Sequence, residues 1–245
     1  MQAPQVLEPR AGPIERFAVA HGGGHPLLVF VVAMLAALAL IASTSIALGL
    51  LVVHVLLHIS ALARWDEHVN VWLAAHRTPS RTHLSTIGSI LSGGVVLPIV
   101  AGFTALAAAV LREWRVAAFI VFVLGVESAS YRITTLAVHR HRPRVLRLEH
   151  LPVNASYPSG HTAAGIAVYG GLALLLTSLV RNVAFRVAVW IVALALPAFD
   201  VWSRLYRGMH HPLDIAGGVV VGIASIVGLV LACRASGVAA QERTA

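Results

Sequence analysis

Residues 26–63 read PLLVFVVAMLAALALIASTSIALGLLVVHVLLHISALA, an almost unbroken apolar run. About 20 apolar residues suffice for one helix to cross the hydrocarbon core of a bilayer. The run is too long for the apolar part of a cleaved signal peptide, which has about 7 to 15 residues. It therefore predicts a retained first membrane helix over 27–58 that tilts, breaks near Gly49 or projects beyond the bilayer.

Five further apolar runs follow, and they predict helices over 84–110, 116–138, 162–180, 187–205 and 212–233. Hydrophobic residues make up 58% of the 245 residues and charged residues only 11%. The sequence thus predicts an all-α, polytopic membrane protein with six transmembrane helices. We expect the membrane domain to occupy 26–235, between a disordered cytoplasmic tail over 1–25 and a second cytoplasmic tail over 236–245.

The polar segment between the first two spans has a helical pattern of its own. Four apolar residues recur at helical spacing, namely Trp65, Val69, Trp72 and Leu73. Tryptophan suits the headgroup region, and Asp66 and Glu67 would suit the first turn of a helix. The pattern predicts a short helix that lies on the membrane surface.

Arginine is unevenly distributed. All 18 basic residues are arginine, and the formal net charge is +8. Six crossings place both termini on one side, where arginines flank short loops as they do on cytoplasmic faces. The opposite face has even more of them: Arg64, Arg77, Arg81, Arg140, Arg142, Arg144, Arg147, Arg204 and Arg207. This excess favours phosphate or anionic lipid as a partner, and nucleic acid is not expected for so buried a chain.

Three polar segments reach the arginine-rich face, over 135–144, 158–161 and 203–214. The planar fork of arginine suits tetrahedral oxyanions, so Arg142 and Arg204 can clamp a phosphate. Backbone N–H groups at Ser159 and Gly160, just before a helix, can donate to the same anion. The segments therefore predict a phosphate site.

Two histidines in these segments provide groups for phosphoryl transfer. A neutral imidazole can attack phosphorus while an imidazolium protonates the leaving oxygen, and His210 and His161 are available for these roles. Asp214, one helical turn after His210, can accept the other ring N–H and set the tautomer. No H-E-x-x-H or cysteine pairing accompanies the histidines, so we expect neither a metal nor a cofactor.

The order and spacing of these motifs resemble the type 2 phosphatidic acid phosphatase superfamily of membrane lipid phosphatases. The resemblance covers roughly residues 60 to 230 and rests on Arg142-Pro143, Pro158-Ser159-Gly160-His161, and Ser203-Arg204 followed by His210 and Asp214. It implies a phosphohistidine at His210, general acid catalysis by His161 and orientation of the nucleophile by Asp214. It also implies that four residues hold phosphate oxygens: Arg142, Ser159, Gly160 and Arg204.

One position departs from the family pattern. The first motif of the family begins with a lysine seven residues before its arginine, and Thr135 stands there. Arg140, Arg144 and Arg132 are candidates for the missing cation, and Ser203 and Thr135 are auxiliary candidates. An alternative function is therefore a catalytically impaired protein that binds or transports lipid phosphates.

The resemblance also implies a substrate class and a location. A polyprenyl diphosphate is the first choice, followed by phosphatidylglycerophosphate or phosphatidate. The expected location is the extracytoplasmic face of the plasma membrane, and the Ala- and Arg-rich composition favours a bacterial one. Vanadate or phosphate is expected as a site ligand. Vanadium-dependent haloperoxidases share the anion site, but they are soluble, and six spans argue against that activity. The oligomeric state is not indicated.

Several polar or small residues lie within the predicted spans. Glu127 or Asp200 is expected to pair with a neighbouring arginine and hold the helices around the site, and a proton path is the alternative. His54 and His58 are expected to have a packing or interface role. Three glycines in the last span are expected to permit close helix packing, namely Gly217, Gly218 and Gly222.

Overall fold

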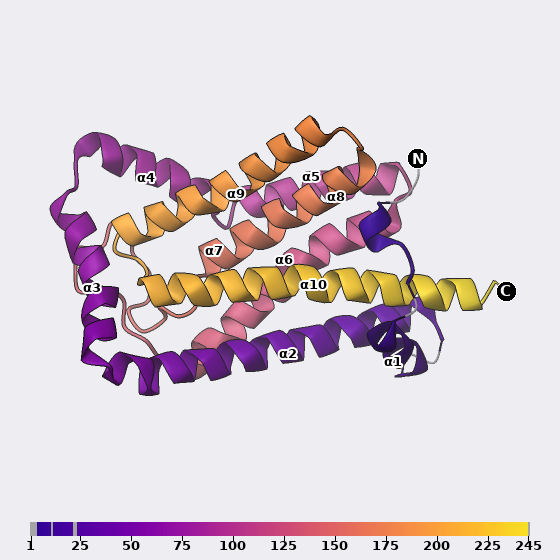
Figure 1. Ribbon diagram of the computed structural model, residues 1–245, viewed down its shortest axis with the longest axis horizontal. Coiled ribbons are helices and arrows are strands. Elements are labelled where there is room, and N and C mark those ends of the chain that lie inside the picture. Colours follow the sequence, from indigo (N-terminus) through magenta and orange to yellow (C-terminus); the bar gives the residue numbers. More distant parts are fainter. Residues whose placement is uncertain (1–3, 11, 22–23, 245) are drawn as a thin grey trace.

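The computed structural model describes residues 4–10, 12–21 and 24–244, and its regular elements there are all helices (Figure 1). The short N-terminal elements are η1 (Gln5–Leu7) and α1 (Pro13–His21). The elements that follow are α2 (Pro26–His54), η2 (Leu56–His58), α3 (Ser60–Ala75), α4 (Pro79–Leu91), α5 (Val96–Val110), α6 (Trp114–Ala137), α7 (Gly160–Gly165), η3 (Ile166–Gly170), α8 (Gly171–Leu179), α9 (Val183–Tyr206) and α10 (Pro212–Glu242).

Six helical segments of the described chain are long and apolar enough to cross a membrane. They are Pro26–His58, Pro79–Val110, Trp114–Ala137, Gly160–Leu179, Val183–Tyr206 and Pro212–Glu242. The second segment joins α4 and α5 across a short bend, and the fourth joins α7, η3 and α8 without a gap. The predicted all-α, six-span membrane fold is confirmed, and the protein is a multi-pass membrane protein.

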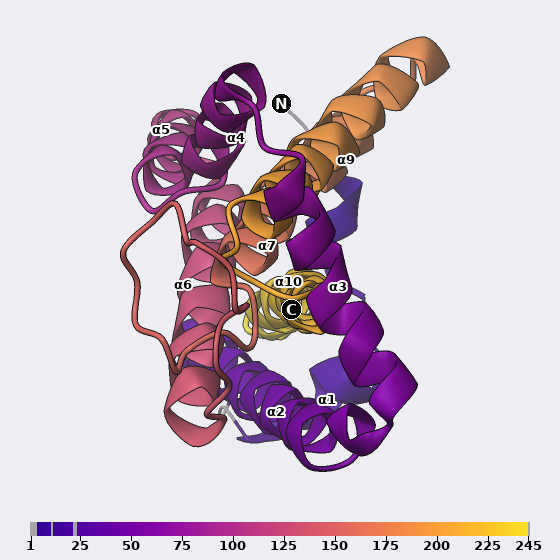
Figure 2. The same cartoon turned by 90° about the vertical axis from the view of Figure 1, so that its left-hand side faces the viewer.

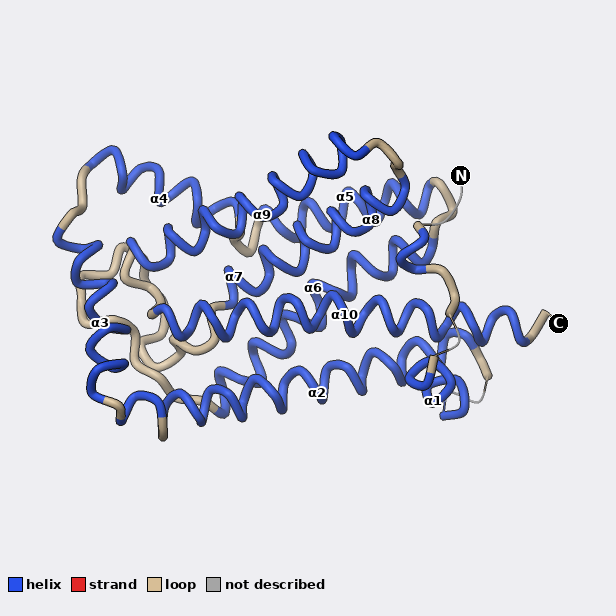
Figure 3. The backbone as a smooth tube through the Cα atoms, in the orientation of Figure 1, coloured by secondary structure: helices blue, strands red, loops and turns tan. Residues whose placement is uncertain are grey.

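The two chain ends lie at the same end of the bundle, and α3 crosses the opposite end (Figures 1 and 3). The α9–α10 joint and the long loop after α6 also reach the α3 end. This arrangement agrees with six crossings, which require joints 1–2, 3–4 and 5–6 to share one side. The three motif segments are therefore brought to one end of the bundle.

Helix α3 confirms the predicted helix after the first span, but it begins at Ser60 rather than near Trp65. Asp66 and Glu67 consequently lie inside the helix, and the prediction that they occupy its first turn was wrong. The helix is two-faced, because Trp65 and Trp72 are exposed whereas Asp66 and Asn70 are buried. Figure 2 shows α3 lying across the ends of the long helices.

Helix α2 is continuous through Gly49 and does not break there. A side chain at Gly49 would clash with the ring of Tyr157 and with Val138, so the glycine lets the loop after α6 approach α2. The helical path ends at His54 and turns at Val55. The predicted break of the first helix near Gly49 is therefore excluded. The side chains of His54 and His58 are exposed and do not pack inside the bundle.

Two predictions about the termini differ from the structure. The predicted disordered tail over 1–25 contains η1 and α1 in its described part, and α1 packs against α2 and α10. The predicted tail over 236–245 is largely the end of α10, which continues to Glu242. Apolar contacts explain why both terminal segments are helical. Ala235 and Ala239 of α10 are buried against Val29 of α2 and Val19 of α1.

Close contact between α7 and α10 depends on glycine. A Cβ atom at Gly218 would lie 2.5 Å from the carbonyl oxygen of Ser159, and one at Gly222 would lie 2.7 Å from that of Ala163. Larger residues would push α10 away from the start of α7. The expectation that these glycines permit close packing is confirmed, and Gly217 similarly faces the ring of Tyr157.

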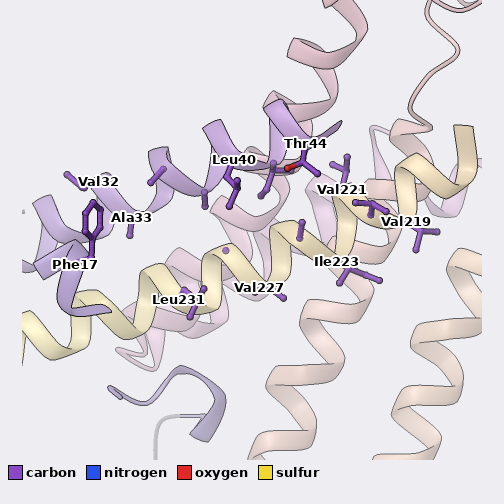
Figure 4. Close-up of a pocket in the computed structure, with 16 residues that line it drawn as sticks. Phe17, Val32, Ala33, Leu40, Thr44, Val219, Val221, Ile223, Val227 and Leu231 are labelled. Atoms are coloured by element: carbon purple, nitrogen blue, oxygen red, sulfur yellow. The ribbon is translucent and has the colours of Figure 1, made fainter. Parts of the chain in front are cut away.

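An apolar groove of about 610 Å³ runs between α1, α2 and α10 (Figure 4). Phe17, Leu40, Val227 and Leu231 are among its lining residues, and Thr44 contributes a polar atom. The residues lining it include no ionisable side chain. The groove is suited to apolar contacts rather than to chemistry.

Candidate active site

The three motif segments meet around one cavity of about 350 Å³. It is lined by residues from the α4–α5 joint, α5, α6, α7 and the two polar loops, including Arg142, Gly160, His161 and His210. Leu97, Pro98, Leu124 and Leu151 form an apolar part of the wall. The two predicted catalytic histidines therefore face the same space, although they are 49 positions apart in the chain.

His210 lies in the α9–α10 joint and is 2% exposed. Its Nδ1 atom is 2.7 Å from the carbonyl oxygen of Ser156, and its Nε2 atom is 3.5 Å from Nη1 of Arg142. A carbonyl can only accept and a guanidinium can only donate, so Nδ1 carries the proton and Nε2 has the lone pair. Burial, together with the charges of Arg204 and Arg142, lowers the pKa of His210 well below its ordinary value. In this tautomer the neutral ring has a free lone pair on Nε2 and can act as a nucleophile.

Asp214 does not make the hydrogen bond predicted for it. Its Oδ2 atom is 3.9 Å from Nδ1 of His210, beyond hydrogen-bond distance. Instead the carboxylate accepts from Ser156 Oγ at 2.6 Å and from the backbone N–H of His211 at 2.8 Å, and it pairs with Arg140. Two contacts account for this placement. The carboxylate of Asp214 caps the start of α10, and it is attracted by the positive charge of Arg140. Asp214 thus reaches His210 through Ser156.

Arg204 is fully buried near the end of α9 and is held from one side. Its Nη1 atom donates to Ser89 Oγ at 2.8 Å and to Glu149 Oε2 at 2.9 Å. Its Nε and Nη2 atoms have no partner among the described residues. These two nitrogens form the side-on fork of a guanidinium, which matches two oxygens of a phosphate. Arg204 does not itself line the cavity, but its charge acts on His210.

Glu149 was not recognised from the sequence, although it is the only acidic residue between Glu127 and Asp200. It also accepts from Nε of Arg207 at 2.7 Å. Burial alone raises its pKa, but the charge of Arg204 and the hydrogen bonds from Arg204, Ser89 and Arg207 lower the pKa to about 2. The carboxylate therefore stays ionised and fixes the guanidinium of Arg204.

Arg142 is held rigidly by the loop around it. Its Nε and Nη2 atoms donate to the carbonyls of Pro152 at 2.9 Å and Ala155 at 2.8 Å, and Nη1 donates to the carbonyl of Met209. Because Nη1 also lies beside the Nε2 atom of His210, a phosphoryl group approaching that nitrogen meets a fixed positive charge.

The Pro-Ser-Gly-His segment forms the start of α7, with Ser159 as the N-cap residue. The backbone N–H of Ser159 donates to the carbonyl of Asp214 at 3.0 Å, so the predicted role of this N–H as a phosphate donor is wrong for this structure. Gly160 lines the cavity, and a Cβ atom added there would lie 3.0 Å from the ring of Tyr131. His161 is half-buried and lines the cavity with no hydrogen bond to another described residue.

The auxiliary residues lie outside the cavity. Thr135 donates to the carbonyl of Arg132 at 2.9 Å, and Ser203 donates to the carbonyl of Ser85 at 2.5 Å, which ties α9 to α4. Arg140 is buried between the carboxylates of Asp66 and Asp214. Arg140 therefore does not substitute for the missing lysine, because both of its partners are acidic side chains of the surrounding scaffold.

Two buried acids also differ from expectation. Glu127 accepts from Ser128 Oγ at 3.1 Å, and Asp200 accepts from Thr162 Oγ1 at 3.2 Å. Neither forms an ion pair with an arginine in the described chain. Glu127 lies in the wall of the cavity, and Asp200 lies behind α7. The predicted arginine pairing of these acids was wrong.

Helix α3 braces the candidate nucleophile from outside the motifs. Asn70 donates from Nδ2 to the carbonyls of Leu205 and His210, both at 2.9 Å. Asp66 accepts from the backbone N–H of Leu213 at 3.0 Å and pairs with Arg140. Asn70 was not recognised from the sequence, and Asp66 was expected only as an acidic residue of the first helical turn, because no local pattern shows which loop these side chains contact.

The fold and this cavity define a class: a six-span helical membrane protein with two buried arginines, Arg142 and Arg204, near two histidines. Residues 116–236, which contain all three motifs, match the PAP2 superfamily. This part of the chain belongs to the superfamily.

Comparisons with individual proteins agree with this assignment. An undecaprenyl-diphosphatase of Sulfolobus acidocaldarius is 32% identical over 107 residues, which are 44% of this chain and 48% of that protein. The matched part thus spans about half the length of the archaeal relative. Phosphatidylglycerophosphatase B of Bacillus subtilis is 24% identical over 184 residues, which cover 73% of this chain and 88% of the relative.

Solved structures resemble the fold. A PAP2-type phosphatidylglycerolphosphate phosphatase from Bacillus subtilis superposes with a TM-score of 0.63, at 24% identity, over 76% of this chain and 92% of that chain. Aquifex aeolicus LpxE superposes with a TM-score of 0.50, at 20% identity, over 67% of this chain and 94% of that chain. The similarity extends to the arrangement of the membrane helices.

Proposed function

We propose that this protein is a membrane lipid phosphatase that removes the terminal phosphate from a lipid phosphate or diphosphate. One observation carries the proposal: the Nε2 atom of neutral His210 faces the same cavity as His161, with Arg142 fixed beside it. A protein that only held phosphate would need neither a nucleophile of set tautomer nor a second histidine.

In the first proposed step, the lone pair of Nε2 of His210 attacks phosphorus as the bond to the leaving oxygen breaks. His161 gives a proton to that oxygen. Arg142 and the open fork of Arg204 stabilise the charge on the phosphoryl oxygens. The Ser156 carbonyl keeps the proton on Nδ1, and Asp214 holds Ser156 in place.

In the second step, water attacks the phosphohistidine, and the phosphorus–nitrogen bond breaks to restore His210. His161, now neutral, accepts a proton from that water. The net reaction consumes one water and yields inorganic phosphate and the dephosphorylated lipid. Besides this water, the two histidines supply the electron pair and the proton transfers that balance the two steps.

A polyprenyl diphosphate is our first choice of substrate, and phosphatidylglycerophosphate or phosphatidate is the second. The names of the relatives support both choices, since one is a diphosphatase and the other a phosphatidylglycerophosphatase. The apolar wall of Leu97, Pro98 and Leu124 supports a lipid leaving group. We propose that the reaction takes place at the extracytoplasmic face. In this orientation the termini, and the arginines that flank the short loops on the same side, lie in the cytoplasm, as the positive-inside tendency requires.

Phosphate release by purified protein tests the proposal. A panel of the three lipids is assayed with a chelator present, for the wild type and for His210→Ala. We expect the wild type to release phosphate from at least one lipid and His210→Ala to release none. The substitution should leave the expression level and the elution profile of the protein unchanged. Headgroup binding without release from any lipid would favour the lipid-binding alternative, for which the neutral Thr135 outside the cavity is the supporting feature.

A further inference from the structure

A second hollow shares Arg142 with the cavity that contains His161 and His210. It has a volume of about 410 Å³ and is lined by His141, Arg142, Pro143, Arg144, Arg147 and Val153. We call it the outer basic hollow. Arg142 lines both this hollow and the cavity that contains His161 and His210. The candidate catalytic site and a second basic space therefore share one arginine.

The arginines of the outer basic hollow are not neutralised by the protein. Arg142, Arg144 and Arg147 form no ion pair within the described residues. The nearby acids have other partners. Glu67 accepts from the backbone N–H of Arg144 and lies 3.1 Å from Nε2 of His211. Glu149 forms its ion pairs with Arg204 and Arg207. Three like charges around one space repel each other, and an oxyanion among them would relieve the repulsion.

The hollow is also held in shape. The backbone of Arg144 is tied to α3 through Glu67 at 2.8 Å, and Nη1 of Arg147 donates to the carbonyl of Leu151 at 3.1 Å. Arg142 is fixed by three backbone carbonyls. The backbone of the loop and the side chains of Arg142 and Arg147 are thus anchored, which lowers the entropy lost on binding an anion.

The two spaces differ in what can pass through them. The wall of the inner cavity contains Leu97, Pro98, Leu124 and Leu151, and moving a phosphate dianion past such apolar groups is costly. The outer basic hollow provides guanidinium groups instead. Arg142, which lines both spaces, therefore offers a phosphate freed at His210 a positively charged way from the inner cavity to the outer basic hollow.

We propose that His141, Arg144 and Arg147, together with Arg142, form a second oxyanion site that receives phosphate from the candidate catalytic site. The exit role rests on the proposed phosphatase function, but the binding site itself does not. The ligand is a phosphate group. Its source is either the released inorganic phosphate or the headgroup of an anionic lipid, and we favour the released phosphate because Arg142 is shared.

Equilibrium dialysis with radiolabelled inorganic phosphate tests the site in full-length protein in a non-ionic detergent. We expect Arg144→Gln/Arg147→Gln to bind one phosphate fewer per chain than the wild type. The control Arg16→Gln/Arg243→Gln removes the same charge from the opposite end of the bundle and should bind as many phosphates as the wild type. Arg204→Gln should lose the inner phosphate and keep the outer one.

Equal phosphate stoichiometry in the wild type and Arg144→Gln/Arg147→Gln would overturn the site. Because dialysis requires no turnover, this result is independent of whether the protein is a phosphatase. A fluorescent phosphate sensor then tests the exit role in the first turnover. We expect phosphate to appear several-fold later than the lipid product in Arg144→Gln/Arg147→Gln, and together with it in the control.

Nanodiscs with and without phosphatidylglycerol distinguish the two sources. One outcome would assign the site to a lipid headgroup and overturn the exit role. In it, the wild type binds one phosphate fewer in nanodiscs with phosphatidylglycerol than in nanodiscs without it, and Arg144→Gln/Arg147→Gln releases phosphate without delay. A delayed release that is unaffected by phosphatidylglycerol supports the exit role.

Discussion

The Nδ1 atom of His210 and the Oδ2 atom of Asp214 are 3.9 Å apart, and Ser156 connects them. The hydroxyl of Ser156 donates to Asp214, and its carbonyl accepts from His210. The acidic residue of the third motif therefore positions the histidine through the backbone of a different loop. Its effect on catalysis should be smaller than that of a directly bonded carboxylate.

The pair Ser156→Ala and Asp214→Asn tests this arrangement. Ser156→Ala keeps the carbonyl that sets the tautomer of His210, so we expect kcat to fall by no more than about tenfold. Asp214→Asn leaves Arg140 with one carboxylate partner and disturbs the start of α10, so we expect a loss of about 10²-fold. Steady-state kinetics measures both, and a greater loss in Ser156→Ala than in Asp214→Asn would contradict the arrangement.

The proposed general acid predicts a dependence on the leaving group. His161→Asn should lower turnover of a lipid phosphate by about 10²- to 10⁴-fold, because an alkoxide leaves poorly without a proton. Turnover of p-nitrophenyl phosphate should fall far less, since nitrophenolate needs no proton to leave. His210→Ala serves as the control and should lose both activities. Equal losses on both substrates in His161→Asn would assign His161 another role.

Glu149 should control the affinity of Arg204 for phosphate. Glu149→Ala frees the guanidinium from its anchor, and we expect the inhibition constant of vanadate and the KM to rise about tenfold. Glu149→Gln keeps a hydrogen-bond acceptor and should have an intermediate effect. Glu113→Gln, in the α5–α6 joint, is the matched control. Unchanged vanadate inhibition in Glu149→Ala would show that Arg204 is held by other contacts.

The lowered pKa of His210 predicts the pH dependence of activity and stability. Because the folded ring stays neutral below its ordinary pKa, the acid limb of kcat/KM attributable to His210 should lie well below pH 6.5. The unfolded chain takes up this proton near pH 6.5 while the folded chain does not, so this histidine makes stability fall as the pH drops below 6.5. Thermal unfolding in detergent at pH 7.5 and 5.5 should show a smaller decrease for His210→Ala than for the wild type.

The contact between α10 and α7 predicts a glycine-specific effect. Gly218→Ala places a methyl group 2.5 Å from the Ser159 carbonyl, and we expect destabilisation of about 1–3 kcal/mol and reduced turnover. Gly125→Ala in α6 meets no atom within 4 Å and should be neutral or slightly stabilising. Thermal unfolding of both variants measures the difference. An equally stable Gly218→Ala would show that α10 can move away from α7.

Much of the fold follows from local patterns. Long apolar runs set the six spans, and the spacing of Trp65, Val69 and Trp72 indicated α3. The terminal segments were mispredicted because their short apolar stretches, such as Ala235–Ala239, become helical through packing rather than through length. The start of α3 was missed because Ser60 lies within the first apolar run and no local signal marks the boundary.

The candidate site was predicted in part. The motif spacing brought His210, His161 and Arg142 to one end of the bundle, and the structure places all three at one cavity. Glu149 was missed because its partner Arg204 lies 55 positions away, and its single acidic charge in an arginine-rich loop was the only signal. Ser156 was missed because it acts mainly through a backbone carbonyl, which any residue possesses.

The sequence by itself determined that the chain crosses a membrane six times and which polar segments share one end, because hydrophobic burial depends on runs of residues along the chain. Only the tertiary structure decided which acceptor holds His210, that Arg140 lies between Asp66 and Asp214, and that Arg142 lines both the cavity of His161 and His210 and the outer basic hollow. These contacts join residues far apart in the chain. They depend on differences of about one ångström in side-chain distance, and local sequence patterns do not encode such differences.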